Sequence, residues 1–244
     1  MDVTVAPVAV ALDAPDLTTL ERWACAVGPY VSTVKVGLET YLRDGAQAVT
    51  AARRGAPNAE LFLDLKLHDI PATVAGAAHA VSALRPDLLT VHASGGAAMI
   101  SAAAEALPDT RIVAVTVLTS LTVDDLGAMG LLPNGADAPD VRALAVRLAV
   151  EATGAGAGAV VCSPEEVGDI RAALAANGRD GVVLITPGVR PAGAALGDQR
   201  RVATPREALD RGADLLVIGR PITGAPDPGA AAAAIAAEIT HGDV

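Results

Sequence analysis

The sequence contains very little lysine and few aromatic residues. Of its 244 residues, 18 are Lys or Arg, but only Lys35 and Lys66 are lysines, and the aromatics are one Trp, one Phe and two Tyr. The 28 acidic residues bring the formal charge to −10. Such a chain lacks both a basic surface for duplex nucleic acid and the aromatic platforms on which single strands stack. We therefore expect no nucleic-acid partner, although a small anion could bind where a few cations converge.

Cysteine and long apolar runs are also scarce. Cys25 and Cys162 are the two cysteines, and their wide separation fits neither a disulfide framework nor a structural zinc site. We expect both to be buried free thiols in a reducing cytoplasm. No apolar run approaches the roughly 18 residues of a membrane span, and the N-terminus lacks the features of a signal peptide. The prediction is a cytoplasmic protein without a membrane partner.

Short β-branched or Leu-rich runs recur along the whole chain and alternate with segments of helical length. The runs cover residues 8–12, 33–36, 60–65, 88–91, 112–118, 159–162, 182–185 and 215–218. Helical segments include residues 17–27, 74–84, 141–152 and 164–176, and the Ala-rich stretch 230–237 is expected to form a terminal helix. Eight such units predict a single-domain α/β protein, a (β/α)8 TIM barrel over residues 1–244 with its active site at the C-terminal ends of the strands.

A doubly wound open sheet is the alternative fold. That fold usually has a Gly-rich fingerprint after the first strand, whereas here the first strand ends in Leu12-Asp13-Ala14-Pro15. Two long connections, residues 120–140 and 190–204, follow strands and are expected to be loops on the face that carries the active site.

Both lysines fall at predicted strand ends, beside carboxylates. Asp64 and Lys66 are two residues apart on one strand and should point to the same side, with Asp69 in the following loop. Lys35 and Asp13 end neighbouring strands, which completes a ring of five charges. Arg cannot release a proton near neutral pH, whereas a buried Lys can, so the pattern favours proton chemistry. The alternative is a structural ion pair, with Asp69 as a helix N-cap before Pro71.

The turns after the seventh and eighth strands indicate a phosphate site. They read Thr186-Pro187-Gly188-Val189-Arg190-Pro191 and Ile218-Gly219-Arg220-Pro221. Loops at these two places commonly bind phosphate in barrels, through backbone N–H groups and a cation. His92 is either a base or a packed residue, and a metal site with Asp64 or Asp69 would be opposed by the adjacent lysines, so no metal is expected.

The residues at these strand ends together resemble the orotidine 5′-phosphate decarboxylase family. The resemblance is carried by Asp64-Leu-Lys66-Leu-His-Asp69-Ile70-Pro71-Ala-Thr73, Val34-Lys35-Val-Gly-Leu-Glu39, Val91-His92-Ala-Ser, Leu-Thr119-Ser120, Thr186-Pro187-Gly-Val-Arg190, Gly197-Asp-Gln199-Arg-Arg201 and Gly219-Arg220-Pro221. It covers about residues 8–225. The D-x-K-x-x-D core is shared with related sugar-phosphate decarboxylases and hexulose-phosphate synthases, whereas Lys35 in place of a metal-binding Glu favours the orotidine branch.

The resemblance implies decarboxylation of orotidine 5′-phosphate to uridine 5′-phosphate and CO₂ in pyrimidine biosynthesis, without metal or organic cofactor. It implies that Lys66 protonates C6 beside Asp64, and that the enzyme is a homodimer. By the same resemblance, Asp13 and Lys35 hold ribose hydroxyls and complete the charge array, and Asp69, Ile70 and Thr73 reach into the partner subunit's site. Thr119 and Ser120 face the pyrimidine, while Gln199 and Arg220 clamp the phosphate with Arg190 at the loop between them. Pro187 and Gly219 are also expected to bind substrate, and Lys35 and Asp69 to be catalytic with Asp64 and Lys66.

Three alternatives remain open from the sequence. The first is a metal-dependent sugar-phosphate decarboxylase or aldolase of the same suprafamily. The second is an aldolase in which Lys66 forms a Schiff base. The third is a barrel that binds a phosphorylated ligand without turnover.

Overall fold

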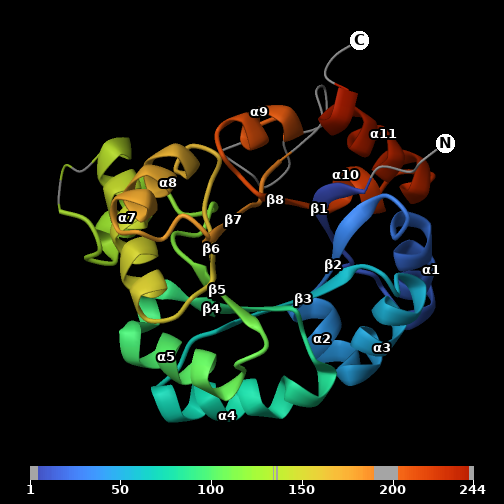
Figure 1. The fold of residues 1–244 in the computed structure, drawn as a ribbon, viewed down its shortest axis with the longest axis horizontal. Coiled ribbons are helices and arrows are strands. Elements are labelled where there is room, and N and C mark those ends of the chain that lie inside the picture. Colours follow the sequence, from blue (N-terminus) through green and yellow to red (C-terminus); the bar gives the residue numbers. More distant parts are fainter. Residues whose placement is uncertain (1–4, 134, 136, 190–202, 242–244) are drawn as a thin grey trace.

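The computed structural model describes residues 5–133, 135, 137–189 and 203–241, and the chain forms a closed parallel barrel in them. Each strand pairs with the next, and β8 pairs with β1 to close the ring (Figure 1). The strands are β1 Ala6–Ala11, β2 Val31–Gly37, β3 Glu60–Leu67, β4 Leu88–His92, β5 Arg111–Val115, β6 Ala159–Val161, β7 Val183–Thr186 and β8 Leu215–Ile218. The predicted (β/α)8 barrel is confirmed.

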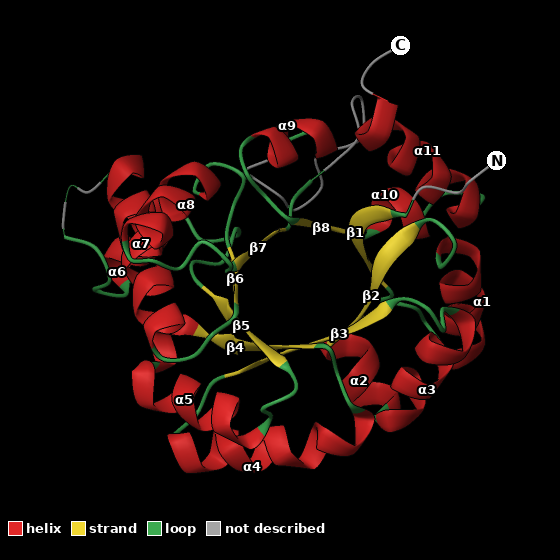
Figure 2. Cartoon of the chain, viewed as in Figure 1, coloured by secondary structure: helices red, strands yellow, loops and turns green. Residues whose placement is uncertain are grey.

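Helices surround the strand ring on its outside (Figure 2). They are α1 Leu17–Val27, α2 Leu38–Asp44, α3 Ala46–Gly55, α4 Pro71–Val81, α5 Ala97–Ala106, α6 Val123–Ala128, α7 Ala138–Gly154, α8 Val167–Ala176, α9 Pro205–Asp210, α10 Arg220–Thr223 and α11 Pro228–His241. The Ala-rich tail is helical as predicted. No helix in the described ranges has the length and apolar character needed to cross a membrane.

A small apolar cluster fills the inside of the barrel. It consists of Ala9, Phe62, Leu88, Val113, Ala159, Ile185 and Leu215, which come from seven of the strands. Phe62, the single phenylalanine, is almost completely buried and is the largest side chain of this cluster. The cluster closes the lower barrel, so a ligand can enter only above it, toward the C-terminal ends of the strands.

Three expectations from the sequence need correction. Cys162 is buried as predicted, but Cys25 is exposed on α1, on the side of that helix away from the core. The connection 120–140 is not all loop, since Thr122 and Asp125 form a capping box that begins α6. Residues 112–118 were expected to be one strand, but β5 ends at Val115, and the hydroxyl of Thr116 then donates to the Val161 carbonyl.

Helices α1 and α3 approach each other closely at Gly55. A Cβ atom at this position would lie 2.6 Å from both the Ala24 Cβ and the Glu21 carbonyl oxygen of α1. Gly168 in α8 is the matched contrast, because a Cβ there would meet no atom within 4 Å.

We predict that Gly55→Ala lowers the free energy of unfolding by about 1–3 kcal/mol, since α1 and α3 must separate to admit the methyl group. Gly168→Ala should leave it unchanged or raise it by up to about 1 kcal/mol, because Ala is the better helix former. Urea unfolding of the two variants measures both effects. If the two substitutions changed the free energy of unfolding equally, the close approach of α1 and α3 at Gly55 would be contradicted.

Candidate active site

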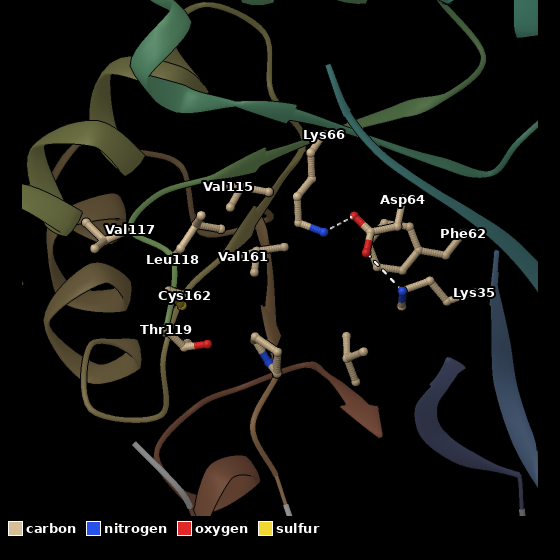
Figure 3. Close-up of a pocket in the computed structure, with 12 residues that line it drawn as sticks. Lys35, Phe62, Asp64, Lys66, Val115, Val117, Leu118, Thr119, Val161 and Cys162 are labelled. Carbon is tan, nitrogen blue, oxygen red and sulfur yellow. Dashed lines mark hydrogen bonds and ion pairs between the residues drawn. The ribbon is translucent and has the colours of Figure 1, made fainter. Parts of the chain in front are cut away.

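One carboxylate and two ammonium groups form a continuous charged chain at the C-terminal end of the barrel. Lys66 Nζ lies 2.7 Å from Asp64 Oδ1, and Lys35 Nζ lies 3.0 Å from Asp64 Oδ2 (Figure 3). The side chains of Lys35 and Asp64 are 9% and 11% exposed, whereas that of Lys66 is 29% exposed. Lys66 is therefore the member of the chain that solvent or a ligand can reach most easily.

The pairing of β2 with β3 brings Lys35 beside Asp64. Lys35 is in register with Phe62, and Gly37 is in register with Asp64. A Cβ atom at Gly37 would lie 2.8 Å from Asp13 Oδ1 and 3.0 Å from Lys35 Nζ. Glycine at this position therefore leaves room for Asp13 and Lys35 to approach each other.

A bulge in β3 shapes the backbone at Lys66. The regular alternation of side chains along a strand does not predict this bulge. The β3–β4 register passes from Leu63↔Leu89 to Leu67↔Val91, so β3 carries extra residues between them. Within this bulge Lys66 has φ +47°, a left-handed conformation that is uncommon for a residue with a side chain. Asp64 and Lys66 do meet as the sequence predicted, but through a bulged backbone.

Asp64 and Lys35 favour each other's charged form. Burial disfavours the carboxylate of Asp64, but the ammonium groups of Lys35 and Lys66 outweigh it and lower the pKa of Asp64 to about 2. Burial likewise opposes the charged form of Lys35, yet the carboxylates of Asp64 and Asp13 raise its pKa. The site thus presents fixed, alternating charges at neutral pH.

A hollow of about 200 Å³ opens beside the charged chain. Its opposite wall is largely apolar: Val115, Val117, Leu118, Val161 and Cys162 face the two lysines and Asp64 across it (Figure 3). Phe62 lies among its lining residues, and Thr119 is at its edge. Burial raises the pKa of the Cys162 thiol, so this wall stays uncharged. The sequence pattern gave no signal for these wall residues beyond their positions near strand ends.

A second hollow of about 280 Å³ adjoins the first, since Lys35, Asp64, Pro187 and Val217 line both. More charged side chains line the second hollow relative to its apolar residues than line the first. Asp13 lies on one side of it, and Gly219 and Arg220 lie on the other. Together the hollows fall within the range of about 300–1,000 Å³ typical of small-molecule sites. A ligand with one cationic contact at Arg220 could thus extend to Lys66.

Several predicted site residues lie away from these hollows. Ser120 is exposed next to Thr119, and Asp69, Ile70 and Thr73 are exposed around the start of α4. Ile70, at 66% exposure, is the N-cap residue of α4, and the Asp69 carboxylate accepts its backbone N–H; the alternative prediction that Asp69 is the N-cap is therefore wrong. Arg190 and Gln199 lie outside the described residues, so their predicted roles stay predictions.

The two histidines near Lys66 do not form a metal centre. The rings of His68 and His92 have centroids 5.3 Å apart. Burial is the main cause that lowers the pKa of His92, and the neighbouring His68 and Lys66 lower it further. Across the described ranges there is no group of three or more His, Cys, Asp or Glu side chains that could hold a metal ion.

Comparison with known proteins gives consistent matches over nearly the whole chain. The model of the orotidine 5′-phosphate decarboxylase / HUMPS family matches residues 6–235. The orotidine 5′-phosphate decarboxylase of Thermobifida fusca is 66% identical over 96% of each chain, and that of Frankia casuarinae is 57% identical over 96% of this chain and 88% of its own. The crystal structure of the Lactobacillus acidophilus orotidine 5′-phosphate decarboxylase is similar with a TM-score of 0.76 and 34% identity, covering 96% of this chain and 99% of its own.

The lowered pKa of Asp64 predicts a pH-dependent effect of Asp64→Asn on stability. In the unfolded chain the pKa is 3.8 and in the folded protein about 2, so the charged carboxylate stabilises the fold above 3.8 and this contribution is lost as the pH falls toward 2. At pH 7 its size is about 2 kcal/mol by linkage.

The free energy of unfolding, measured with urea at several pH values, tests this expectation. The difference in free energy of unfolding between the wild-type protein and the Asp64→Asn variant should be largest at neutral pH and should become smaller below a pH of about 4. A gap that stays constant down to pH 3 would show that Asp64 titrates normally in the folded protein.

Proposed function

The chain belongs to the orotidine 5′-phosphate decarboxylase / HUMPS family and is a carboxy-lyase, and from this premise we propose that it converts orotidine 5′-phosphate to uridine 5′-phosphate and CO₂ in cytoplasmic pyrimidine biosynthesis. We propose that its own side chains suffice, without a metal or organic cofactor. The observation that carries the proposal is the Lys35–Asp64–Lys66 chain, which faces an apolar wall.

The chemical difficulty of the reaction lies in the carbanion that it creates. When the bond between C6 and the carboxylate breaks, the electron pair stays on C6 and CO₂ leaves, and the pyrimidine ring has no adjacent group to accept that pair. Fixed positive charge next to C6 stabilises the developing anion. Lys66 supplies this charge, and its Nζ then donates a proton to C6.

Asp64 acts on the other end of the breaking bond. Its carboxylate stays ionised between the two lysines, so a substrate carboxylate placed against it meets a like charge. The repulsion diminishes as the carboxylate becomes neutral CO₂, which lowers the energy of the transition state relative to the bound substrate. The apolar wall opposite, with Val115, Leu118 and Val161, suits CO₂ better than an anion.

The second hollow suits the ribose 5′-phosphate. Asp13 lines the second hollow and Lys35 lines both, and these two side chains would hold ribose hydroxyls. Gly219 and Arg220 would bind the phosphate, and Pro187, which lines both hollows, would also contact the substrate. Thr119 and Ser120 would face the pyrimidine. Arg190 and Gln199, outside the described residues, are proposed to complete the phosphate site. Binding energy from the phosphate would then contribute to the chemistry at C6.

We propose that the active enzyme is a homodimer. Asp69, Ile70 and Thr73 lie on the exposed segment that leads from Lys66 into α4. Ile70 is a large apolar side chain that is 66% exposed, and burial of this residue against a second subunit would be favourable. The same contact would carry Asp69 into the neighbouring active site.

The test is the loss of orotidine 5′-phosphate absorbance with dialysed, chelator-treated protein. Full turnover after chelation supports the proposal, whereas activity that needs added divalent metal would favour the related sugar-phosphate lyases. Borohydride trapping of a substrate adduct on Lys66 would favour a Schiff-base aldolase. Binding of uridine 5′-phosphate without any turnover would identify a ligand-binding barrel.

We predict that Lys66→Ala lowers kcat by about 10³-fold or more, because both the charge beside C6 and the proton donor are lost. Binding of uridine 5′-phosphate, measured by calorimetry, should persist, since the phosphate contacts lie at the other hollow. Lys66→Arg is the matched control for charge: it keeps the cation but does not release a proton near neutral pH, and it should also be inactive. Near-normal turnover by either variant would contradict the role of Lys66.

A further inference from the structure

Thr90, in the middle of β4, is completely buried and is hydrogen-bonded to both functional residues of β3. The backbone N–H of Lys66 donates to Thr90 Oγ1 over 2.8 Å. The hydroxyl of Thr90 in turn donates to Asp64 Oδ1 over 2.9 Å. One side chain of the neighbouring strand therefore links the backbone of Lys66 to the carboxylate that Lys66 faces.

The direction of both hydrogen bonds is fixed by chemistry. A backbone N–H can only donate, so Thr90 Oγ1 accepts from Lys66. Asp64 is ionised and can only accept, so the hydroxyl proton of Thr90 points to it. Asp64 Oδ1 thus receives the Thr90 hydroxyl and Lys66 Nζ, while Oδ2 faces Lys35. Because both carboxylate oxygens have partners, the Asp64 side chain has little freedom to rotate.

The hydrogen bond from the Lys66 backbone N–H to Thr90 lies where β3 is bulged and its regular pairing with β4 is interrupted. β3 carries extra residues opposite β4 between Leu63 and Leu67, and Lys66 sits in this bulge with φ +47°. A left-handed backbone is strained for a residue with a side chain and persists only where the surroundings hold it. The Thr90 hydroxyl accepts the amide of the strained residue and so helps to hold it.

We infer that Thr90 is a positioning residue of the reaction: its hydroxyl holds the Lys66 backbone in the bulge and orients the Asp64 carboxylate, so that the two groups face the reacting C6 together. Thr90 does not line either hollow and so acts through Asp64 and Lys66. The inference rests on the proposed decarboxylation.

Thr90→Val removes the hydroxyl with almost no change of shape. The Lys66 amide then loses its acceptor, and Asp64 loses a donor on the oxygen that faces Lys66. We expect kcat for orotidine 5′-phosphate to fall by about 10- to 100-fold, the effect of losing hydrogen bonds to a charged group. KM should change by less than about threefold, because the phosphate and ribose contacts lie elsewhere. Thr90→Ser restores the hydroxyl and should recover kcat to within about threefold of the wild-type value.

Thr33→Val is the matched control. Thr33 is also a completely buried threonine on a barrel strand, but its hydroxyl pairs with Ser32 and not with the charged chain. The Thr33→Val variant should have a lower free energy of unfolding in urea, while its kcat stays unchanged. If Thr90 had a structural role only, Thr90→Val would behave like Thr33→Val, with lower stability and a normal kcat for the folded protein.

The outcomes separate this inference from the function on which it rests. If the wild-type protein does not decarboxylate orotidine 5′-phosphate, the proposed function fails and the positioning role fails with it. If the wild-type protein is active and Thr90→Val keeps a normal kcat, only the role of Thr90 is overturned. If Thr90→Val does not fold, Thr90→Cys, with its weaker donor and acceptor, should fold with a reduced kcat, and a wild-type kcat in that variant overturns the role equally.

Discussion

The carboxylate of Asp64 between the ammonium groups of Lys35 and Lys66 is the interaction on which the rest of the site depends. Without Asp64, the two ammonium groups would lie near each other in a partly buried site with no carboxylate between them, which is unfavourable. With it, the positive charge of Lys66 is held at one place beside a hollow. The parallel pairing of β2 with β3 brings Lys35 to the other oxygen of Asp64, and the absence of a side chain at Gly37 leaves room for Lys35 beside Asp13.

The barrel gives these charges a rigid floor. Phe62 precedes Asp64 by two residues on β3 and belongs to the apolar cluster that fills the lower barrel. This buried apolar cluster lies beneath the charged chain, and the two hollows open on its other side. Electrostatic interactions are stronger in such a partly buried site than in open water, and the proposed stabilisation of a carbanion depends on this.

The sequence predicted most of this arrangement because its signals are local and periodic. Eight apolar runs alternating with helical segments specify the barrel, and Lys35 and Lys66, the two lysines of the chain, both fall at ends of predicted strands beside carboxylates. The wall formed by Val115, Leu118 and Val161 could not be found in this way, because these residues look like any other buried strand residues. The exposure of Cys25 was also missed, since it depends on the face that α1 turns to solvent.

The bulge at Lys66 was the least predictable feature, and its position at the site has a physical reason. Simple alternation already places Asp64 and Lys66 on the same side of a strand, but it fixes neither the reach nor the direction of the lysine. A left-handed backbone at Lys66 changes that direction, and the Thr90 hydroxyl on the adjacent strand satisfies the amide that the bulge removes from the ladder. Proteins depart from local rules mainly where function demands it and the surroundings supply compensation. The departure at Lys66 is consistent with the role proposed for this residue, which depends on where its ammonium group is placed.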